Sequence, residues 1–450
     1  MYAFSTMAID SDAAARTAFV PQKGAVPVRI ARTEGNYLIT PDGTHILDAG
    51  GGAIVVNIGH GREEVAEVAA QALREVTYAI PPFATEARIR LVERLTANWL
   101  PRGLTRVGFT SGGSESVDAA IRLARSHHLA AGRTGRWKVI GREQSYHGIT
   151  LATLAVGGHV NRRKGFEPLL LDFPKAPSHY CLECSLGRHD DGCIDRAADG
   201  LEEVILREGP DTIAAFIAEP VVGGAAGAVV PPDNYWPRVR AICDNYGVLL
   251  IADEVMTGFG RTGRKFAVDH WNVVPDIMTG GKGLAGGYAP MGGVYATDAV
   301  VAPMIEAGMD MMFYTFTGHH ASCAVADKVL EIMEREDLVA RAAKMGDLLR
   351  ERLARLEGHP NVAEVRGLGL LQAVELVRDR ETLERFPAAD KFVNKITAIG
   401  LQKGVFFYPA GSGVAQDIVL LGPPFTITED EIDMVASILE ESIDLAVAGR

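Results

Sequence analysis

The order of apolar and polar positions predicts alternating strands and helices in the middle of the chain. Between about residues 104 and 297, short apolar runs alternate with stretches of helical periodicity. This alternation is typical of a parallel sheet with crossover helices, and strands that are apolar at every position indicate that both faces of the sheet are covered. The predicted strands are Thr105–Thr110, Trp137–Gly141, Ile213–Ala218, Val248–Ala252, Asp276–Thr279 and Gly292–Ala296.

A helix is predicted over Ser114–Gly132, directly after the first of these strands. Val117, Ile121 and Ala124 recur on roughly one face. Ser114 followed by Glu115 is the pattern of an N-cap with an acid in the first turn. The sequence therefore predicts a strand, a tight turn and a helix in succession.

The two chain ends differ from the middle. Residues 1–60 show short turns and strands, and the C-terminal part predicts a helix over Glu331–Leu356, a strand over Gly369–Val377 and a last helix from Thr428. We expect an α/β protein with a mainly parallel central sheet sandwiched by helices. The predicted domains are a large one over 61–319 and a small α+β domain made of 1–60 and 320–450.

Composition narrows the class of protein. The 450 residues carry 45 Lys and Arg against 57 Asp and Glu, a net charge of −12, which argues against a nucleic-acid binder. There is neither a secretory signal pattern nor an uncharged apolar stretch of about 18 residues. The odd number of cysteines, 5, is typical of a reducing compartment. We expect a cytoplasmic globular protein that does not bind membranes.

The turn before the predicted helix is a candidate anion site. It reads Thr110-Ser111-Gly112-Gly113-Ser114-Glu115. Two glycines permit close backbone approach, and the free N–H groups of a helix start attract negative charge. A structural Gly-rich turn is the alternative for this motif taken alone.

Two further strand ends carry chemistry. Asp253 follows the apolar run Val248–Ala252, and Lys282 lies among glycines after Asp276–Thr279. Ligands bind at the carboxyl ends of strands in α/β sheets, so Asp253 is placed to meet a cationic group. Glycines beside Lys282 leave room for a group joined to its amine. A loop-capping carboxylate and a flexible surface lysine are the alternatives.

Together the three features fit pyridoxal phosphate, which needs a phosphate cradle, a carboxylate at its ring nitrogen and a lysine for its aldehyde. Here the sequence resembles the class III (ω-amino acid and amine) aminotransferases of the fold-type I pyridoxal phosphate enzymes. The resemblance spans about residues 30–430. Its motifs are SGGSESVDAAIRLAR, SYHG, AEPV, LLIADEVMTGFGRTG, TGGKGLAGGYAPMGGV, YTFTGHHASCAVA and RGLGLLQAVEL.

The resemblance implies a role for each matching residue. Lys282 is expected to form the Schiff base and to move the substrate proton, and Asp253 to keep the ring nitrogen protonated. Tyr146 is expected to stack on one face of the ring and Val255 to press on the other. Further cofactor contacts are expected from Gly113 and Ser114 at the phosphate, Glu219 near the cofactor and substrate, and Thr315 at the phosphate of the neighbouring subunit.

The role of Thr315 implies an obligate homodimer with active sites at its interface. The expected activity moves an amino group from an amine or ω-amino acid to a keto acid such as pyruvate by a ping-pong mechanism. A racemase, decarboxylase or lyase of the same fold is the alternative, and a non-enzymatic cofactor-bearing protein is a more distant one.

The chain departs from the family at the substrate pocket. Members that accept dicarboxylic or keto acids often carry an arginine near the C-terminus, but here Tyr408 stands at about that place and Arg450 is the only arginine after residue 401. Ile54 stands where related enzymes often carry tryptophan. We therefore expect a roomier pocket and carboxylate recognition by another group, with Arg261, Arg264 and Arg366 as candidates.

A cysteine-containing loop offers a metal-binding alternative. Cys181, Cys184, His189 and Cys193 have the residue types for one tetrahedral zinc. The loop lacks a hairpin signal, so we favour reduced cysteines and predict no metal site. The pairs His127-His128 and His319-His320 do not converge on one ion from a helix, which favours packing or surface roles.

Overall fold

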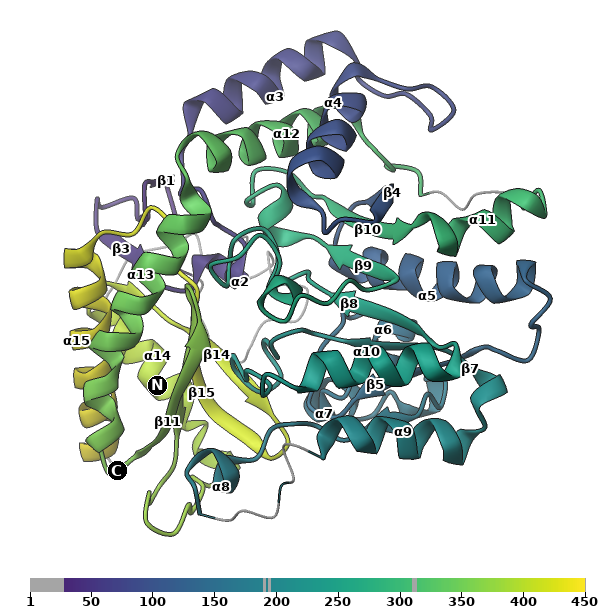
Figure 1. Ribbon diagram of the computed structural model, residues 1–450. Helices are drawn as coiled ribbons and strands as arrows, with labels where there is room; N and C mark the ends of the chain where they lie inside the picture. Colours follow the sequence, from purple (N-terminus) through teal and green to yellow (C-terminus); the bar gives the residue numbers. More distant parts are fainter. Residues whose placement is uncertain (1–27, 189–191, 193–195, 310–313, 450) are drawn as a thin grey trace.

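The computed structural model describes residues 28–188, 192, 196–309 and 314–449 (Figure 1). Within these ranges the strands form three sheets. No helix of the described residues is long and apolar enough to cross a membrane.

The largest sheet has the order β4-β10-β9-β8-β7-β5-β6. Its strands from β9 to β6 are parallel, whereas β10 runs antiparallel to both of its neighbours. The predicted mainly parallel sheet is confirmed, and each of the strands predicted between residues 104 and 297 agrees with an observed one to within a residue at either end. The bounds are β4 Leu104–Thr110, β10 Gly292–Thr297, β9 Ile277–Gly280, β8 Leu249–Asp253, β7 Ile213–Ala218, β5 Lys138–Arg142 and β6 Lys175–Ala176.

Helices cover both faces of this sheet, which explains the continuous apolar runs (Figure 1). Phe216 and Leu250 belong to the core shared with α9 and α10, whereas Ile217 and Ile251 belong to the core shared with α5. Alternate residues of one strand therefore face two different helix layers. The helices around this sheet are α5 Gly113–Ala130, α6 Leu151–Val156, α7 Val160–Arg163, α9 Ala197–Glu208, α10 Tyr235–Tyr246 and α11 Asp298–Glu306, whereas α8 Leu182–Ser185 packs against Ala363 and Val377 outside it.

The two smaller sheets come from the chain ends. The first has the order β1-β2-β3-β13, and β13 pairs in parallel with β3, so that Leu47 faces Val405. The second has the order β11-β12-β15-β14. The proposed domain boundaries remain a prediction. The strands are β1 Arg32–Glu34, β2 Tyr37–Ile39, β3 His45–Asp48, β11 Val362–Leu368, β12 Leu371–Leu376, β13 Val405–Phe406, β14 Tyr408–Ser412 and β15 Ala415–Leu421.

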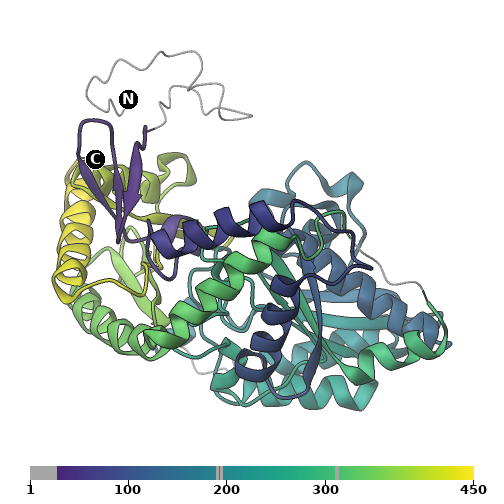
Figure 2. The same cartoon turned by 90° about the horizontal axis from the view of Figure 1, so that it is seen from above.

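The remaining helices connect and cover these sheets (Figure 2). The last helix begins where predicted, because the Thr428 hydroxyl accepts from the Glu431 amide while the Glu431 carboxylate accepts from the Thr428 amide. The bounds are α2 Gly51–Ile54, α3 Glu63–Glu75, α4 Glu86–Arg94, α12 His320–Arg335, α13 Leu338–Leu353, α14 Phe392–Gln402 and α15 Glu429–Ala448.

The single helix predicted over Glu331–Leu356 is wrong. The chain forms two helices, α12 and α13, which are separated at Glu336 and Asp337. Asp337 has φ 48°, a left-handed conformation that ends the first helix. The apolar periodicity continues across this break because both helices bury one face in the same core.

Candidate active site

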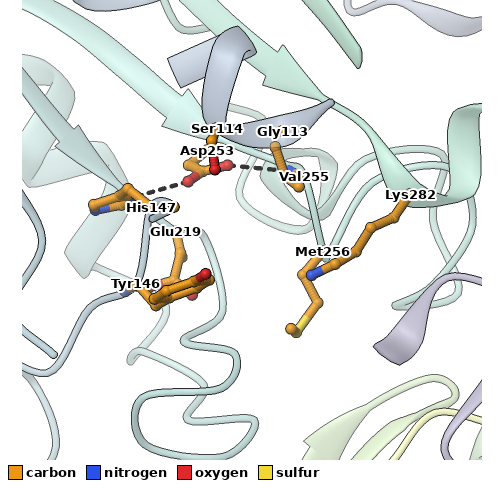
Figure 3. Close-up of a pocket in the computed structure, with 10 residues that line it drawn as sticks. Gly113, Ser114, Tyr146, His147, Glu219, Asp253, Val255, Met256 and Lys282 are labelled. Atoms are coloured by element: carbon orange, nitrogen blue, oxygen red, sulfur yellow. Dashed lines mark hydrogen bonds and ion pairs between the residues drawn. The ribbon is translucent and has the colours of Figure 1, made fainter. Parts of the chain in front are cut away.

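A pocket of about 180 Å³ lies at the carboxyl ends of the central strands, next to the start of α5 (Figure 3). Of the eight predicted site residues, seven line it and Thr315 does not. The lining residues are Gly113, Ser114, Tyr146, His147, Gly148, Glu219, Asp253, Val255, Met256 and Lys282.

The first turn of α5 forms one wall of this pocket, which we call the inner pocket. The helix begins at Gly113, and its first amides have no carbonyl partner within the helix, so they can bind an anion. The predicted N-cap at Ser114 is wrong, because the N-cap is Gly112. Instead, the Ser114 hydroxyl accepts from the backbone amide of Ile149 at 3.2 Å, which joins the helix start to the loop that carries Tyr146.

Asp253 is held at the end of β8 by three donors. Its carboxylate oxygens lie 2.6 Å from Nδ1 of His147, 2.9 Å from the Thr279 hydroxyl and 3.1 Å from the Val255 amide. An ionised carboxylate only accepts hydrogen bonds, so Nδ1 of His147 carries the shared proton. Asp253 is 4% exposed and faces the pocket in a fixed orientation.

Lys282 reaches into the pocket from the side opposite Tyr146 and His147 (Figure 3). It follows β9 with φ 40°, in the left-handed region that side chains other than Gly rarely adopt. Burial lowers the pKa of its amine to about 8, although the carboxylates of Asp253 and Glu219 act in the opposite direction. A large part of the amine is therefore neutral, and nucleophilic, near pH 8.

Glu219 fixes the loop that carries Tyr146. It is 4% exposed at the end of β7, and its two carboxylate oxygens accept from the amides of Tyr146 at 3.0 Å and Gly223 at 2.9 Å. Burial raises the pKa of Glu219, whereas the nearby Arg142 guanidinium lowers it. Glu219 thus links two loops of the pocket wall.

A second, outer pocket of about 620 Å³ adjoins the first. Tyr146, Met256 and Lys282 border both pockets. The further residues that line the outer pocket are Ala53, His159, Asn161, Arg162, Gly224, Val393, Asn394, Tyr408, Pro409, Ala410 and Gly411. Lys282 therefore borders a smaller space on one side and a larger one on the other.

The three arginines considered for carboxylate recognition do not line either pocket. Buried Arg261 donates to the carbonyls of Leu370, Pro423 and Val56. Arg366 forms ion pairs with Glu364 and Glu375, and Arg264 borders a separate surface depression. These predictions are wrong, because Arg261 and Arg366 are engaged elsewhere in the fold and Arg264 lies away from both pockets.

Ile54 does not face the substrate space either. It has φ 56° and is 2% exposed in the core near Gly422, where a Cβ on that glycine would lie 2.7 Å from the Ile54 side chain. The preceding Ala53 lines the outer pocket instead. The prediction that Ile54 widens the substrate pocket is therefore wrong, because its side chain is packed in the core.

The remaining predictions fall outside this site. Thr315 is exposed on a turn, and its carbonyl accepts from the Tyr78 hydroxyl at 3.0 Å, so its proposed contact across subunits stays a prediction. His189 and Cys193 lie outside the described residues, and no metal-binding group of side chains occurs among those that are described. His127 and His128 are buried and lie 2.9 Å from backbone carbonyl oxygens, which confirms a packing role.

His147 and Met256 line the inner pocket without being among the predicted site residues. His147 stands next to Tyr146 in the SYHG motif, so its position in the sequence was a usable signal. Met256 follows Val255 in the same way. The sequence alone did not indicate a role for His147, because its hydrogen-bond partner Asp253 lies 106 positions away.

Comparisons with known proteins agree with this geometry. The family described as Aminotransferase class-III matches residues 19–443. The putrescine–pyruvate aminotransferase of Pseudomonas aeruginosa is 36% identical over 93% of this chain and 91% of the relative. The taurine–pyruvate aminotransferase of Rhodobacter capsulatus is 36% identical over 95% of this chain and 93% of the relative. The structure of the ω-transaminase of Pseudomonas jessenii in complex with PMP has a TM-score of 0.88 and 32% identity, covering 95% and 94% of the two chains.

The chain belongs to the class III aminotransferase family. It is an aminotransferase of fold type I, and its cofactor is pyridoxal phosphate. The inner pocket fits that group chemically, with helix-start amides, a carboxylate and an amine around one space. A Cβ on Gly113 would lie 2.6 Å from Cγ1 of Val255, so glycine at this position leaves Val255 and the start of α5 undisturbed.

Proposed function

We propose that this aminotransferase moves an amino group from an amine or ω-amino acid to a keto acid such as pyruvate, in two successive half-reactions of ping-pong order. The observation that carries the proposal is that Lys282 borders both pockets, so its amine serves a cofactor on one side and a substrate on the other. Two relatives whose names include pyruvate, with putrescine and taurine as donors, support the choice of substrates.

When bound, pyridoxal phosphate supplies an aldehyde that joins the amino nitrogen and a ring that accepts electrons from the substrate carbon. With that group bound, Lys282 Nζ would hold the aldehyde and, once released, would be the base that moves the proton at the substrate carbon. Its pKa of about 8 suits both directions of that transfer near neutral pH. Asp253 holds a proton on the ring nitrogen.

The other residues position these groups. The amides of Gly113 and Ser114 bind the phosphate, and the Tyr146 ring and Val255 hold the cofactor ring between them. Glu219 keeps Tyr146 in place through the 3.0 Å bond to its backbone amide. In this proposal Thr315 of the neighbouring subunit completes the phosphate site.

A homodimer with active sites at its interface is part of the proposal. Large apolar side chains lie exposed close to Thr315 in space or in sequence. Tyr78 bonds the Thr315 carbonyl and packs edge-on against Phe316. An exposed group of this kind is typical of a surface that another chain covers. Its exposed members are Tyr78 at 46%, Ile80 at 41%, Phe83 at 66% and Phe316 at 58%.

The test combines the site of attachment with the reaction. Borohydride reduction of the holoenzyme followed by peptide mass analysis is expected to place the pyridoxyl group on Lys282, and K282A is expected to give no label. A panel of amines and ω-amino acids is then mixed with the holoenzyme, and pyruvate is added while absorbance is recorded. Donor should convert the cofactor and pyruvate should restore it. Carbon dioxide release, inversion of configuration or conversion without restoration would instead indicate the decarboxylase, racemase or lyase.

A further inference from the structure

We propose that Arg162 binds the terminal carboxylate of the amino donor, so that the preferred donors are ω-amino acids rather than simple amines. The proposal rests on the proposed function and names the substrate class for the same site. Arg162 lies on α7 and lines the outer pocket together with Lys282. A donor that occupies this pocket thus has its amine at Lys282 and its other end at Arg162.

Arg162 has the chemistry of a free anion receptor. Its guanidinium forms neither an ion pair nor a side-chain hydrogen bond with any residue that the structure describes. Its neighbour Arg163 is the opposite case, because it donates to the carbonyls of Leu154, Ala155 and Gly157. A guanidinium stays charged at any physiological pH and presents paired donors that match a carboxylate.

The outer pocket offers an anion no competing charge. Asp and Glu are absent from its described lining residues. His159 lies in the same wall, but burial and the charge of Arg162 lower the pKa of its imidazole to about 4, so it is neutral at pH 7. With Lys282 engaged by the cofactor, Arg162 is the permanent cation available among the described side chains of this pocket.

Tyr146 holds Arg162 in position. The guanidinium carbon lies 5.0 Å from the centre of the Tyr146 ring, within the range of a cation–π contact. Because Tyr146 also borders the inner pocket, one aromatic ring connects the anion receptor with the cofactor site. A guanidinium already packed on a ring loses less side-chain freedom when it binds a carboxylate.

The experiment follows the first half-reaction alone, in the holoenzyme without keto acid, so that the carboxylate of pyruvate plays no part. Each ω-amino acid is paired with the amine of equal length: 3-aminopropanoate with propylamine, 4-aminobutanoate with butylamine, and 5-aminopentanoate with pentylamine. Stopped-flow absorbance gives the specificity constant of each. R162Q is expected to lower the constant of the best ω-amino acid at least thirtyfold and that of its paired amine less than threefold, with R162K in between.

The control variant is K164Q, which removes the same charge two positions away from a residue that does not line the pocket. It should behave as the unchanged enzyme. Equal losses for ω-amino acids and amines in R162Q would show that Arg162 only supports the fold of the loop. No loss in R162Q would show that it does not bind the donor. Either result overturns the inference and leaves the proposed transamination intact.

A binding measurement tests the anion site at Arg162 independently of the proposed transamination. Calorimetry with propanoate, butanoate and pentanoate, which have the carboxylate but no amine, measures the receptor without turnover. R162Q should weaken the tightest of these at least tenfold, and K164Q less than twofold. If no donor reacts with pyruvate but this difference persists, the proposed function fails while the anion site at Arg162 stands. Unchanged binding in R162Q would overturn the anion site itself.

Discussion

Nδ1 of His147 and Oδ2 of Asp253 lie 2.6 Å apart, and both side chains are buried at the wall of the inner pocket. Asp253 has two other donors, Thr279 and Val255, but His147 alone approaches its Oδ2 among the hydrogen bonds of the described residues. His147 therefore determines the direction of the carboxylate oxygen, and with it the placement of the negative charge.

Removal of this histidine is expected to impair the enzyme through Asp253. H147A should lower kcat about 10- to 100-fold, since a hydrogen bond to a charged group contributes about 1.5–3 kcal/mol. H147N, whose amide can donate from nearly the same place as Nδ1, should recover most of the loss. The check is steady-state kinetics together with the pH dependence of the absorbance of bound cofactor. An equal loss of kcat in H147A and H147N would mean that the packing of the imidazole ring matters more than its hydrogen bond to Asp253.

Two adjacent glycines give a matched test of the phosphate cradle. A Cβ on Gly113 would lie 2.6 Å from Val255, whereas a Cβ on Gly112 would meet no atom within 4 Å. Gly112 has φ 176°, an extended conformation that alanine adopts. G113A should therefore weaken pyridoxal phosphate binding tenfold or more and G112A less than twofold, measured by titration of the apoenzyme. Similar values for both variants would contradict the assignment of the cradle.

The charge of Asp253 can be tested with D253N. Because the cradle and Lys282 remain, the variant should still bind the cofactor. A neutral partner no longer holds the proton on the ring nitrogen, so turnover should fall at least a hundredfold, or about 2.7 kcal/mol. Absorbance confirms loading and the amine–pyruvate assay measures turnover. Turnover near that of the unchanged enzyme would exclude this role.

The lowered pKa of Lys282 predicts a pH profile. The neutral amine attacks the aldehyde, so the rate of cofactor attachment to the apoenzyme should rise with pH and level off above about pH 8, the pKa of this amine. E219Q removes a carboxylate that favours the charged amine and should move the midpoint to lower pH. Stopped-flow absorbance follows both. A rate that still rises at pH 10, as for an exposed lysine, would contradict the burial argument.

Among the described residues of the outer pocket, Arg162 is the cation left for a substrate once Lys282 holds the cofactor, and this predicts poor use of glutamate. Glutamate carries two carboxylates, and a buried carboxylate without a partner costs on the order of a few kcal/mol. With the same acceptor, the specificity constant of glutamate should be at least tenfold below that of pentylamine. A specificity constant for glutamate more than about tenfold above that of pentylamine, or about 1.4 kcal/mol, would show that another arginine recognises glutamate.

The sequence predicts most of what local pattern determines. The strand Ile213–Ala218 matches β7, because an apolar run with a turn on each side needs no distant information. The residues of the inner pocket follow strand ends in the same way. The predictions fail where residues distant in the sequence determine the local structure. Asp337 ends a helix inside a continuous apolar pattern, and the Ser114 hydroxyl accepts from the Ile149 amide instead of capping its own helix.

Arginines were the hardest residues to assign from the sequence. Arg162 and Arg261 are alike in type, and both stand near polar and aromatic neighbours in the chain. Arg261 is 2% exposed and joins three carbonyls of separate segments, whereas Arg162 faces the outer pocket. Whether an arginine is available to bind a substrate depends on the partners it meets in the folded protein. Residue spacing in the sequence does not reveal those partners.

The pairing of Leu47 in β3 with Val405 in β13 has a consequence for how the protein is made. A nascent chain on the ribosome holds the first strands long before the segment that pairs with them has been synthesised. Ala53 and Tyr408, from opposite ends of the same chain, both line the outer pocket only after that segment emerges. We expect chains released before residue 405 to lack a finished substrate site even though Lys282 and Asp253 are present, and C-terminal truncation followed by calorimetry with the carboxylates would show it.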